Sequence, residues 1–188
     1  MILYLLNIIQ RKIIMDNQLN CCCFIGHRKI EETHNLTNHL YNVIENLIVQ
    51  ENVNVFLFGS KSEFNNLCYR VVSRLKEQYR NIQRIYVRAE FPYIDNSYKA
   101  YLQKRYENSY YPDKIISAGK AAYIERNYEM INNSKYCIMY YDDSYAPPRR
   151  KKSSKDLTDY QPQSGTKLAY NYAVRKCNVI NVFENVKF

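Results

Sequence analysis

The chain has 188 residues, enough for one domain, and 46% of them are hydrophobic, which supports a buried core and excludes a fully disordered chain. Its formal net charge is +9. A charge of this sign suits an anionic partner, namely nucleic acid, an acidic membrane surface or a phosphorylated small molecule, although a diffusely basic surface is the plain alternative.

The first 18 residues are expected to be an N-terminal extension that precedes the domain. Their apolar run, residues 2–9, is shorter than the roughly 20 residues that span a bilayer, and the positive charges follow it instead of preceding it. This pattern argues against a membrane span and against a secretory signal. We therefore expect a cytoplasmic protein with no membrane partner.

From residue 19 to residue 188, short apolar runs alternate with segments of helical periodicity. The predicted strands span 21–26, 53–59, 82–89, 135–141 and 178–183, and the predicted helices span 33–49, 64–79, 121–132 and 164–176. Residues 90–118 are expected to be irregular, and 143–163 to form a basic loop insertion. Because continuous apolar strands between helices are typical of parallel sheets covered on both faces, we predict a single α/β domain. It is a Rossmann-like three-layer sandwich with a mainly parallel central sheet of about five strands.

The run Cys21, Cys22 and Cys23 falls inside the first predicted strand. Successive strand residues point to opposite faces, so these three thiols cannot converge on one metal ion while the strand persists. The remaining cysteines stand alone, and no pair has the spacing of a zinc site. We predict buried, reduced thiols and no metal, with a metal site or disulfides as the alternatives.

Glycines and polar residues gather where the predicted strands end. They are Gly26, His27 and Arg28 after the first strand, Gly59 and Ser60 after the second, Asp142 after the fourth, and Ser164, Gly165 and Thr166 at the last helix. Ligands of such sheets bind outside the carboxyl ends of the strands, and helix N-termini and arginine suit phosphate. These residues are therefore the predicted ligand site, unless the glycines merely serve the loops. The standard dinucleotide and P-loop fingerprints are absent from the sequence, so no cofactor is expected.

Four stretches of the sequence resemble a known family. They read FIGHR at 24–28, FLFGSKSEFNNLCYRVVSRLKEQYRNIQRI at 56–85, ERNYEMINNSKYCIMYYDD at 125–143 and SGTKLAYNYAVRKCNVINVF at 164–183. Together they resemble the YpsA-like branch of the SLOG superfamily, over about residues 22 to 183. That superfamily also contains the Lonely Guy phosphoribohydrolases and the DNA-processing protein DprA.

The resemblance implies a domain that binds a nucleotide or a nucleotide-sugar at the strand ends. It adds Arg126 to the predicted site, because the Arg-Lys-x-x-Met motif of the Lonely Guy enzymes falls on Arg126 to Met130, with Asn127 in place of the Lys. Where those enzymes carry a catalytic Glu, this chain has Ala169. The main expectation is therefore a non-catalytic binder or sensor of a nucleotide-derived ligand, such as an ADP-ribose derivative. Relatives commonly form dimers, so the resemblance also implies a homodimer.

Two alternatives stay open. One is a phosphoribohydrolase-like nucleotide hydrolase that cleaves an N-glycosidic bond, for which Arg126 and Glu129 are the weak catalytic candidates. The other is a DprA-like nucleic-acid-binding protein. Its phosphate contacts would come from the basic run of Arg149, Arg150, Lys151, Lys152 and Lys155, and its stacking surfaces from the tyrosine-rich segments 98–111 and 136–145.

Overall fold

A computed structural model of the chain describes residues 20–89, 93–117, 119–145 and 164–183. The expected N-terminal extension at 1–18 lies outside these residues, as does most of the expected basic loop. The five basic residues of that loop, Arg149, Arg150, Lys151, Lys152 and Lys155, also lie outside the described residues.

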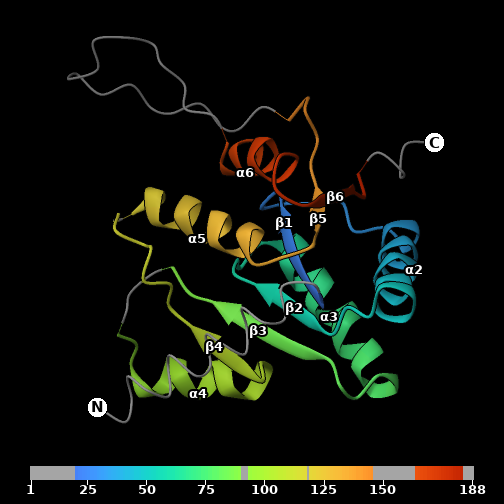
Figure 1. The fold of residues 1–188 in the computed structure, drawn as a ribbon, viewed down its shortest axis with the longest axis horizontal. Helices are drawn as coiled ribbons and strands as arrows, with labels where there is room; N and C mark the ends of the chain where they lie inside the picture. Colours follow the sequence, from blue (N-terminus) through green and yellow to red (C-terminus); the bar gives the residue numbers. More distant parts are fainter. Residues whose placement is uncertain (1–19, 90–92, 118, 146–163, 184–188) are drawn as a thin grey trace.

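The described residues form a three-layer α/β fold around one parallel sheet (Figure 1). The strands are β1 (Cys21–Gly26), β2 (Val55–Phe58), β3 (Gln83–Val87), β4 (Asn108–Tyr110), β5 (Tyr136–Tyr140) and β6 (Asn178–Asn181). The helices are α2 (His34–Glu51), α3 (Glu63–Gln78), α4 (Asn96–Arg105), α5 (Lys120–Asn132) and α6 (Gly165–Ala173). The strand order is β4-β3-β2-β1-β5-β6, with every neighbouring pair parallel. The predicted fold class is confirmed, with a sixth strand added.

The two faces of the sheet are buried under different helices. Strand β1 supplies both cores, because alternate residues point to opposite faces. Cys22 and Phe24 pack with α2, α3 and α4, whereas Cys21 and Cys23 pack with α5 and α6. All three thiols are at most 2% exposed and form no disulfide, which confirms the prediction that they are buried packing residues.

The segment expected to be irregular contains a helix and a strand. Helix α4 buries a single side chain, that of Leu102, and the three residues of β4 are all half-buried. Neither element therefore carries the apolar periodicity that a sequence reading depends on. Their register is fixed instead by pairing of β4 with β3 and by polar contacts.

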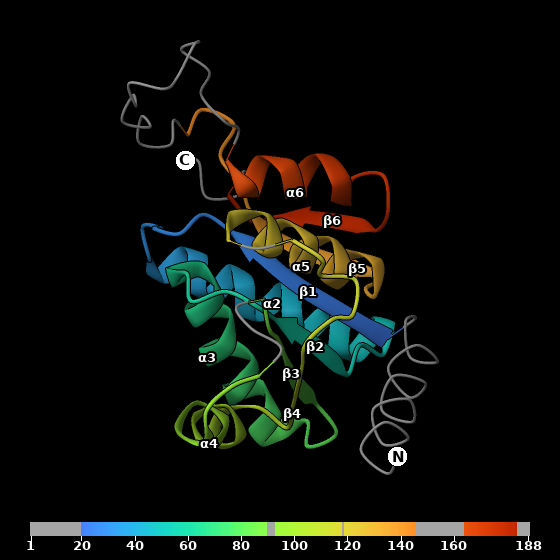
Figure 2. The same cartoon turned by 90° about the vertical axis from the view of Figure 1, so that its left-hand side faces the viewer.

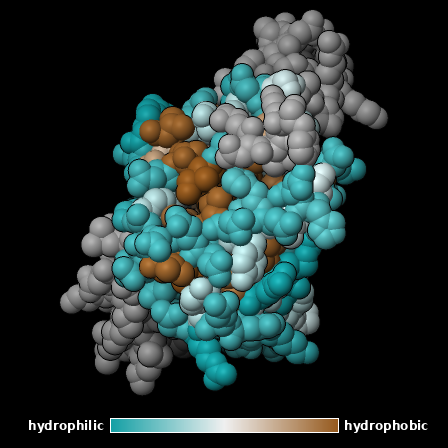
Figure 3. Space-filling model, turned by 90° about the vertical axis from the view of Figure 1, so that its right-hand side faces the viewer, coloured by the Kyte–Doolittle hydropathy of each residue, from teal (hydrophilic) through white to brown (hydrophobic). Residues whose placement is uncertain are grey.

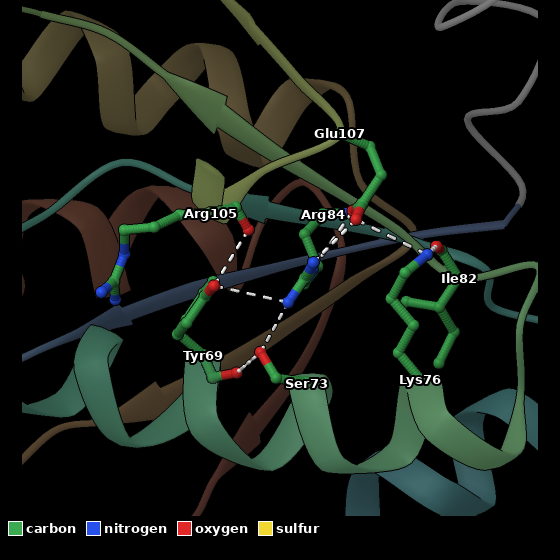
Figure 4. A network of polar contacts seen from close by, with 7 residues as sticks. All are labelled: Tyr69, Ser73, Lys76, Ile82, Arg84, Arg105 and Glu107. Carbon is green, nitrogen blue, oxygen red and sulfur yellow. Dashed lines mark hydrogen bonds and ion pairs between the residues drawn. The ribbon is translucent and has the colours of Figure 1, made fainter. Parts of the chain in front are cut away.

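Those polar contacts centre on Arg84 of β3 (Figure 4). Its guanidinium donates to Glu107 through Nη2 at 2.7 Å and to Ser73 of α3 through Nη1 at 2.7 Å. The Tyr69 hydroxyl, also from α3, donates to the carbonyl oxygen of Arg105 at 3.0 Å. Because the side chain of Arg84 is only 14% exposed, this network joins α3, β3 and the start of β4 in a largely water-excluded setting.

All strands run the same way, so their carboxyl ends lie on one edge of the molecule, toward which the arrowheads of β1 and β6 point in Figure 2. Strand β6 forms one side of the sheet, and its Val179 and Ile180 are half-buried. Figure 3 shows the face that carries α2 and β6, where apolar side chains gather within a largely hydrophilic surface. None of the helices among the described residues has the length and hydropathy needed to cross a membrane.

Candidate nucleic-acid interface at the carboxyl edge of the sheet

The strand order reverses between β1 and β5, and the residues that follow these two strands are bonded to each other. The backbone N–H of Asp142 donates to Nε2 of His27 at 2.9 Å, and the backbone N–H of His27 donates to the carbonyl of Tyr140 at 3.2 Å. The His27 ring also lies against Tyr145, with 4.3 Å between ring centroids. Two predicted site residues, His27 and Asp142, are thus brought together at the switch point of the sheet.

His27 is 3% exposed, and its burial lowers the pKa of the imidazole. Only a neutral ring leaves Nε2 able to accept the hydrogen bond from Asp142. The geometry therefore makes His27 a positioning residue that ties the β1 loop to the β5 loop. The next residues along the chain, Arg28 and Lys29, are exposed and point their charge at solvent.

The loop after β2 is organised by Asn65, a residue that the sequence analysis missed. Its Oδ1 accepts from the N–H groups of Gly59 and Ser60 at 3.4 Å each, while its Nδ2 donates to the Phe24 carbonyl at 3.2 Å. Asn65 is 2% exposed. The signal for it is the helix start Ser62-Glu63-Phe64-Asn65, in which Ser62 accepts from the Asn65 N–H as the N-cap.

Arg126 lies beside the end of β2, as the predicted site requires, but it is 3% exposed. A Cβ atom at Gly59 would stand 2.6 Å from Arg126 Cδ and 2.7 Å from Met130 Sδ. Because Gly59 has no side chain, the Arg126 side chain can pack directly against its backbone. The Arg126 Nε donates to Asn127 Oδ1 at 3.0 Å, and the guanidinium lies 5.7 Å from the Tyr123 ring centre.

The carboxylates that would serve a hydrolase are engaged away from Arg126. Glu125 accepts from the backbone and side chain of Ser117, at 3.0 and 2.6 Å, and Glu129 accepts from Asn133 at 2.9 Å. Ala169 is 1% exposed and packs in the core below α6. This arrangement offers no carboxylate at the position where the Lonely Guy enzymes place theirs.

The start of α6 reaches the end of β1. Ser164 caps the helix by accepting from the Lys167 N–H at 3.1 Å, and the Thr166 hydroxyl donates to the Gly26 carbonyl at 3.3 Å. Gly165 has no atom within 4 Å of where a Cβ would stand, so this position is open to solvent. The three predicted residues of this helix start are thus placed at the switch point with His27.

The described start of the loop after β5, residues 141–145, is acidic and partly neutralised. The Tyr141 hydroxyl donates to Asp143 Oδ1 at 2.5 Å, and Lys167 Nζ donates to the same oxygen at 3.1 Å. The Tyr141 bond, followed by the Lys167 charge, lowers the pKa of Asp143. Burial raises the pKa of Tyr141 to about 12, so its hydroxyl stays a donor at neutral pH.

A line of cations follows the other strands. Every strand from β1 to β4 is followed within four residues by Arg or Lys, namely Arg28, Lys61, Arg88 and Lys114. We call these four residues the cation line. Lys61 lies over the Tyr98 ring at 4.9 Å and Arg88 over the Tyr111 ring at 5.9 Å, so aromatic faces accompany the charge. Arg28 belongs to the site predicted from the sequence, whereas Lys61, Arg88 and Lys114 were not included in that prediction.

Comparisons with protein-family models and with curated proteins find no match. Among solved structures, the fold is similar to that of DNA processing protein A from Helicobacter pylori, described for its single-stranded DNA binding mode. The TM-score is 0.50 at 17% sequence identity, over 87% of this chain and 64% of that chain. At this identity the likeness establishes the fold, and this chain spans less than two thirds of that structure. DNA processing protein A is one of the SLOG members that the sequence resemblance names.

Proposed function

We propose that this chain binds single-stranded nucleic acid along the carboxyl edge of its sheet. The observation that carries this proposal is the cation line. Arg28 and Lys61 are exposed after β1 and β2, and Lys114, which follows β4, is 80% exposed and lies 3.9 Å from Glu129. The fold that the chain shares with a single-stranded-DNA-binding protein supports it. Among the expectations from sequence, this favours the nucleic-acid alternative over the small-ligand sensor.

The physical argument begins with charge. Arg and Lys at successive strand ends lie about one strand spacing apart, roughly 4.8 Å for neighbouring strands, so a row of them can follow a phosphate backbone. Their contacts with phosphate release condensed counterions, which makes the affinity depend steeply on salt. A positively charged track of this kind is the common element of proteins that hold single strands.

The aromatic side chains argue for a single strand over a duplex. Tyr98 and Tyr101 of α4 stack at 6.1 Å, and Tyr101 is 48% exposed. Tyr93, between β3 and α4, is 91% exposed. Unpaired bases can stack on such rings for about 1–3 kcal/mol each, whereas the bases of a duplex are already stacked.

Membership of the YpsA-like branch of the SLOG superfamily is part of this proposal, since it rests on the sequence resemblance together with the shared fold. A free nucleotide-derived ligand is the second candidate, favoured by a hollow that Lys167, Tyr170 and Asn171 of α6 line. Hydrolysis of a nucleotide is not proposed, because Ala169 is buried and Glu125 and Glu129 are engaged elsewhere.

The test is fluorescence anisotropy of labelled single-stranded DNA and RNA oligonucleotides at several salt concentrations. We expect saturable binding to the wild-type chain, and weaker binding to the double variant Arg28→Ala, Lys61→Ala. Loss of two phosphate contacts should reduce the slope of log affinity against log salt by about 1.4, since a single-strand contact contributes about 0.7.

The matched control is Arg80→Ala with Lys104→Ala. These two exposed residues lie at the end of α3 and in the last turn of α4, on the opposite edge of the sheet, and their loss changes the net charge by the same amount. The control should bind like the wild type. The proposal is wrong if the wild type shows no saturable binding, or if the control loses as much affinity as the double variant.

A further inference from the structure

A hollow of about 710 Å³ opens where β5 and β6 end, on a different face of α6 from the one that touches β1. Lys167, Tyr170 and Asn171 line it from α6, at the spacing i, i+3 and i+4 that places side chains on one helix face. Asp143 and Ser144 line it from the loop after β5, and Phe183 from the chain after β6. Its size lies within the range of about 300–1,000 Å³ in which small-molecule sites fall.

One wall of the hollow is aromatic. Tyr170 stacks against Tyr141 with 4.3 Å between ring centroids and 22° between the planes, which holds the Tyr170 ring in place. Phe183 lies edge-on to Tyr140 at 5.3 Å. Rings held in this way by their neighbours present fixed flat surfaces, and a planar heteroaromatic group gains stacking energy on them at little cost in side-chain freedom.

The opposite wall is polar, and its net charge is negative, because Asp142 and Asp143 both line it beside one cation, Lys167. Lys167 is 3.1 Å from Asp143, so the cation that lines the hollow is already paired with a carboxylate. Both hydrogen bonds of Asp143 fall on Oδ1, and its side chain is 77% exposed, so the carboxylate retains capacity to accept further donors. Such a wall suits hydroxyl groups, and it is unsuited to a phosphate.

Asn171 adds an amide to this wall. The residue is exposed and lies one turn of helix beyond Lys167, beside Tyr170. A primary amide presents a donor and an acceptor side by side, and it can pair with a base edge that does the same, as the edge of adenine does.

We propose that this hollow binds a nucleoside, with the base against Tyr170 and Phe183 and the sugar hydroxyls donating to Asp143. The inference deepens the proposed function and rests on it in part, since the hollow lies on the same edge as the cation line. The same nucleoside chemistry is available from a free nucleoside and from one nucleotide of a bound strand. Because the Asp143 carboxylate accepts hydrogen bonds from the sugar hydroxyls, a nucleoside with ribose should bind more tightly than one with dideoxyribose.

The experiment is a calorimetric titration of the full chain with adenosine, guanosine, cytidine and uridine, each alone, and with the 2′,3′-dideoxy form of whichever binds. We expect saturable binding of at least one nucleoside and a loss of at least about tenfold without the sugar hydroxyls, because they bond to a charged group. Asp143→Asn should cause a similar loss, and Asn171→Ala a smaller one. Both residues are exposed, and thermal melting verifies that the variants fold.

The control is Asn38→Ala, which removes an exposed helical Asn of α2 away from the hollow. It should bind like the wild type. The inference is overturned if no nucleoside binds at millimolar concentration, or if Asp143→Asn and Asn171→Ala both bind as tightly as Asn38→Ala. Neither outcome depends on oligonucleotide binding. The nucleoside titration therefore tests the hollow, and the anisotropy assay tests the proposed function separately.

Competition between the nucleoside and a labelled oligonucleotide separates the two sources. Displacement of the strand places one of its own nucleotides in the hollow. Simultaneous binding assigns the hollow to a free nucleoside beside the strand. Either result supports the inference, which depends on the titration and on its variants.

Discussion

The carboxyl edge of the sheet has two halves that differ in charge and in surface. On the side of β1 to β4 it carries the cation line, with Lys61 over an aromatic ring. On the side of β5 and β6 its described residues include Asp142 and Asp143, and Lys167, the cation that lines the hollow, is paired with Asp143. The two halves meet at the switch point, where His27 bonds the β5 loop to the β1 loop.

The difference suggests that one edge of a sheet can offer separate surfaces to the phosphate of a nucleotide and to its base and sugar. A row of cations, among which Lys114 is 3.9 Å from Glu129, attracts phosphate, whereas an aromatic-lined hollow with two carboxylates and one cation suits a base and a sugar. If the two halves are separate, variants of one half should leave the binding of the other half's ligand unchanged.

The largest effect is expected for Glu107→Ala, which acts at the amino ends of β3 and β4, the strands that Arg88 and Lys114 follow at the other edge. Glu107 accepts from Arg84 through its backbone N–H at 2.7 Å and through Nε and Nη2 of the guanidinium, so its loss leaves a mostly buried charge without its carboxylate. We expect the free energy of unfolding in urea to fall by about 1.5–3 kcal/mol, the worth of hydrogen bonds to a charged group. Oligonucleotide binding should weaken while nucleoside binding persists. Glu107→Gln, which keeps hydrogen-bonding atoms, should lose less, and equal losses would contradict the role of the charge.

Gly26→Ala should disturb both halves together, because Gly26 ends the strand that joins them. The added Cβ would stand 2.6 Å from Cγ of Phe64, a fully buried ring. Overpacking of this kind costs about 1–3 kcal/mol of unfolding free energy. Gly165→Ala is the control, since the space there is open, and chemical denaturation of both variants checks the difference. Equal stability of the two variants would show that the Phe64 side chain can shift to accommodate the added Cβ.

A matched pair of lysines compares the halves directly. Lys61→Ala removes an exposed cation of the cation line, whereas Lys167→Ala removes one that Asp143 already neutralises. We expect the salt slope of oligonucleotide binding to fall by about 0.7 for Lys61→Ala and to stay unchanged for Lys167→Ala. The same slope for both variants would mean that the two halves do not differ in phosphate contact.

The smallest effect is expected in the pH dependence of stability that arises from His27, which links the two halves. The pKa of His27 is lowered in the folded state, so below the unfolded value of about 6.5 the unfolded chain binds more protons than the folded one. Its contribution to the stability is therefore present at pH 7 and is lost as the pH falls through about 6.5 and below. Urea denaturation between pH 7 and pH 5 should show a smaller drop for His27→Gln, whose side chain does not titrate. An identical drop would assign the effect to other groups.

The sequence predicted the elements that are buried and missed those that are not. The sequence prediction and the structure both place strand β1 at 21–26, because a short continuous apolar run that ends in Gly indicates a buried strand. Strand β4 and helix α4 escaped because Leu102 is their one buried side chain. Their structure depends on Arg84 and Glu107, a contact 23 residues apart that no local pattern encodes.

The candidate site shows the same limit. Ligands of parallel sheets bind where the strands end, and this principle correctly predicted that His27, Asp142 and Thr166 lie close together. It could not show that Arg126 is buried against Gly59, or that Asn65 occupies the amides of Gly59 and Ser60. Those facts depend on how α3 and α5 pack, which follows from side-chain shape and is not visible in the spacing of residue types.

The central place of β1 has a consequence for how the chain is made. Its Phe24 pairs with Ile138 of β5, a partner that leaves the ribosome more than a hundred residues later. At about 5–20 residues per second, one edge of this apolar strand waits on the order of ten seconds for its neighbour. An unpaired apolar edge is a template for pairing with other chains, so nascent chains that stall before β5 should be the species that aggregates.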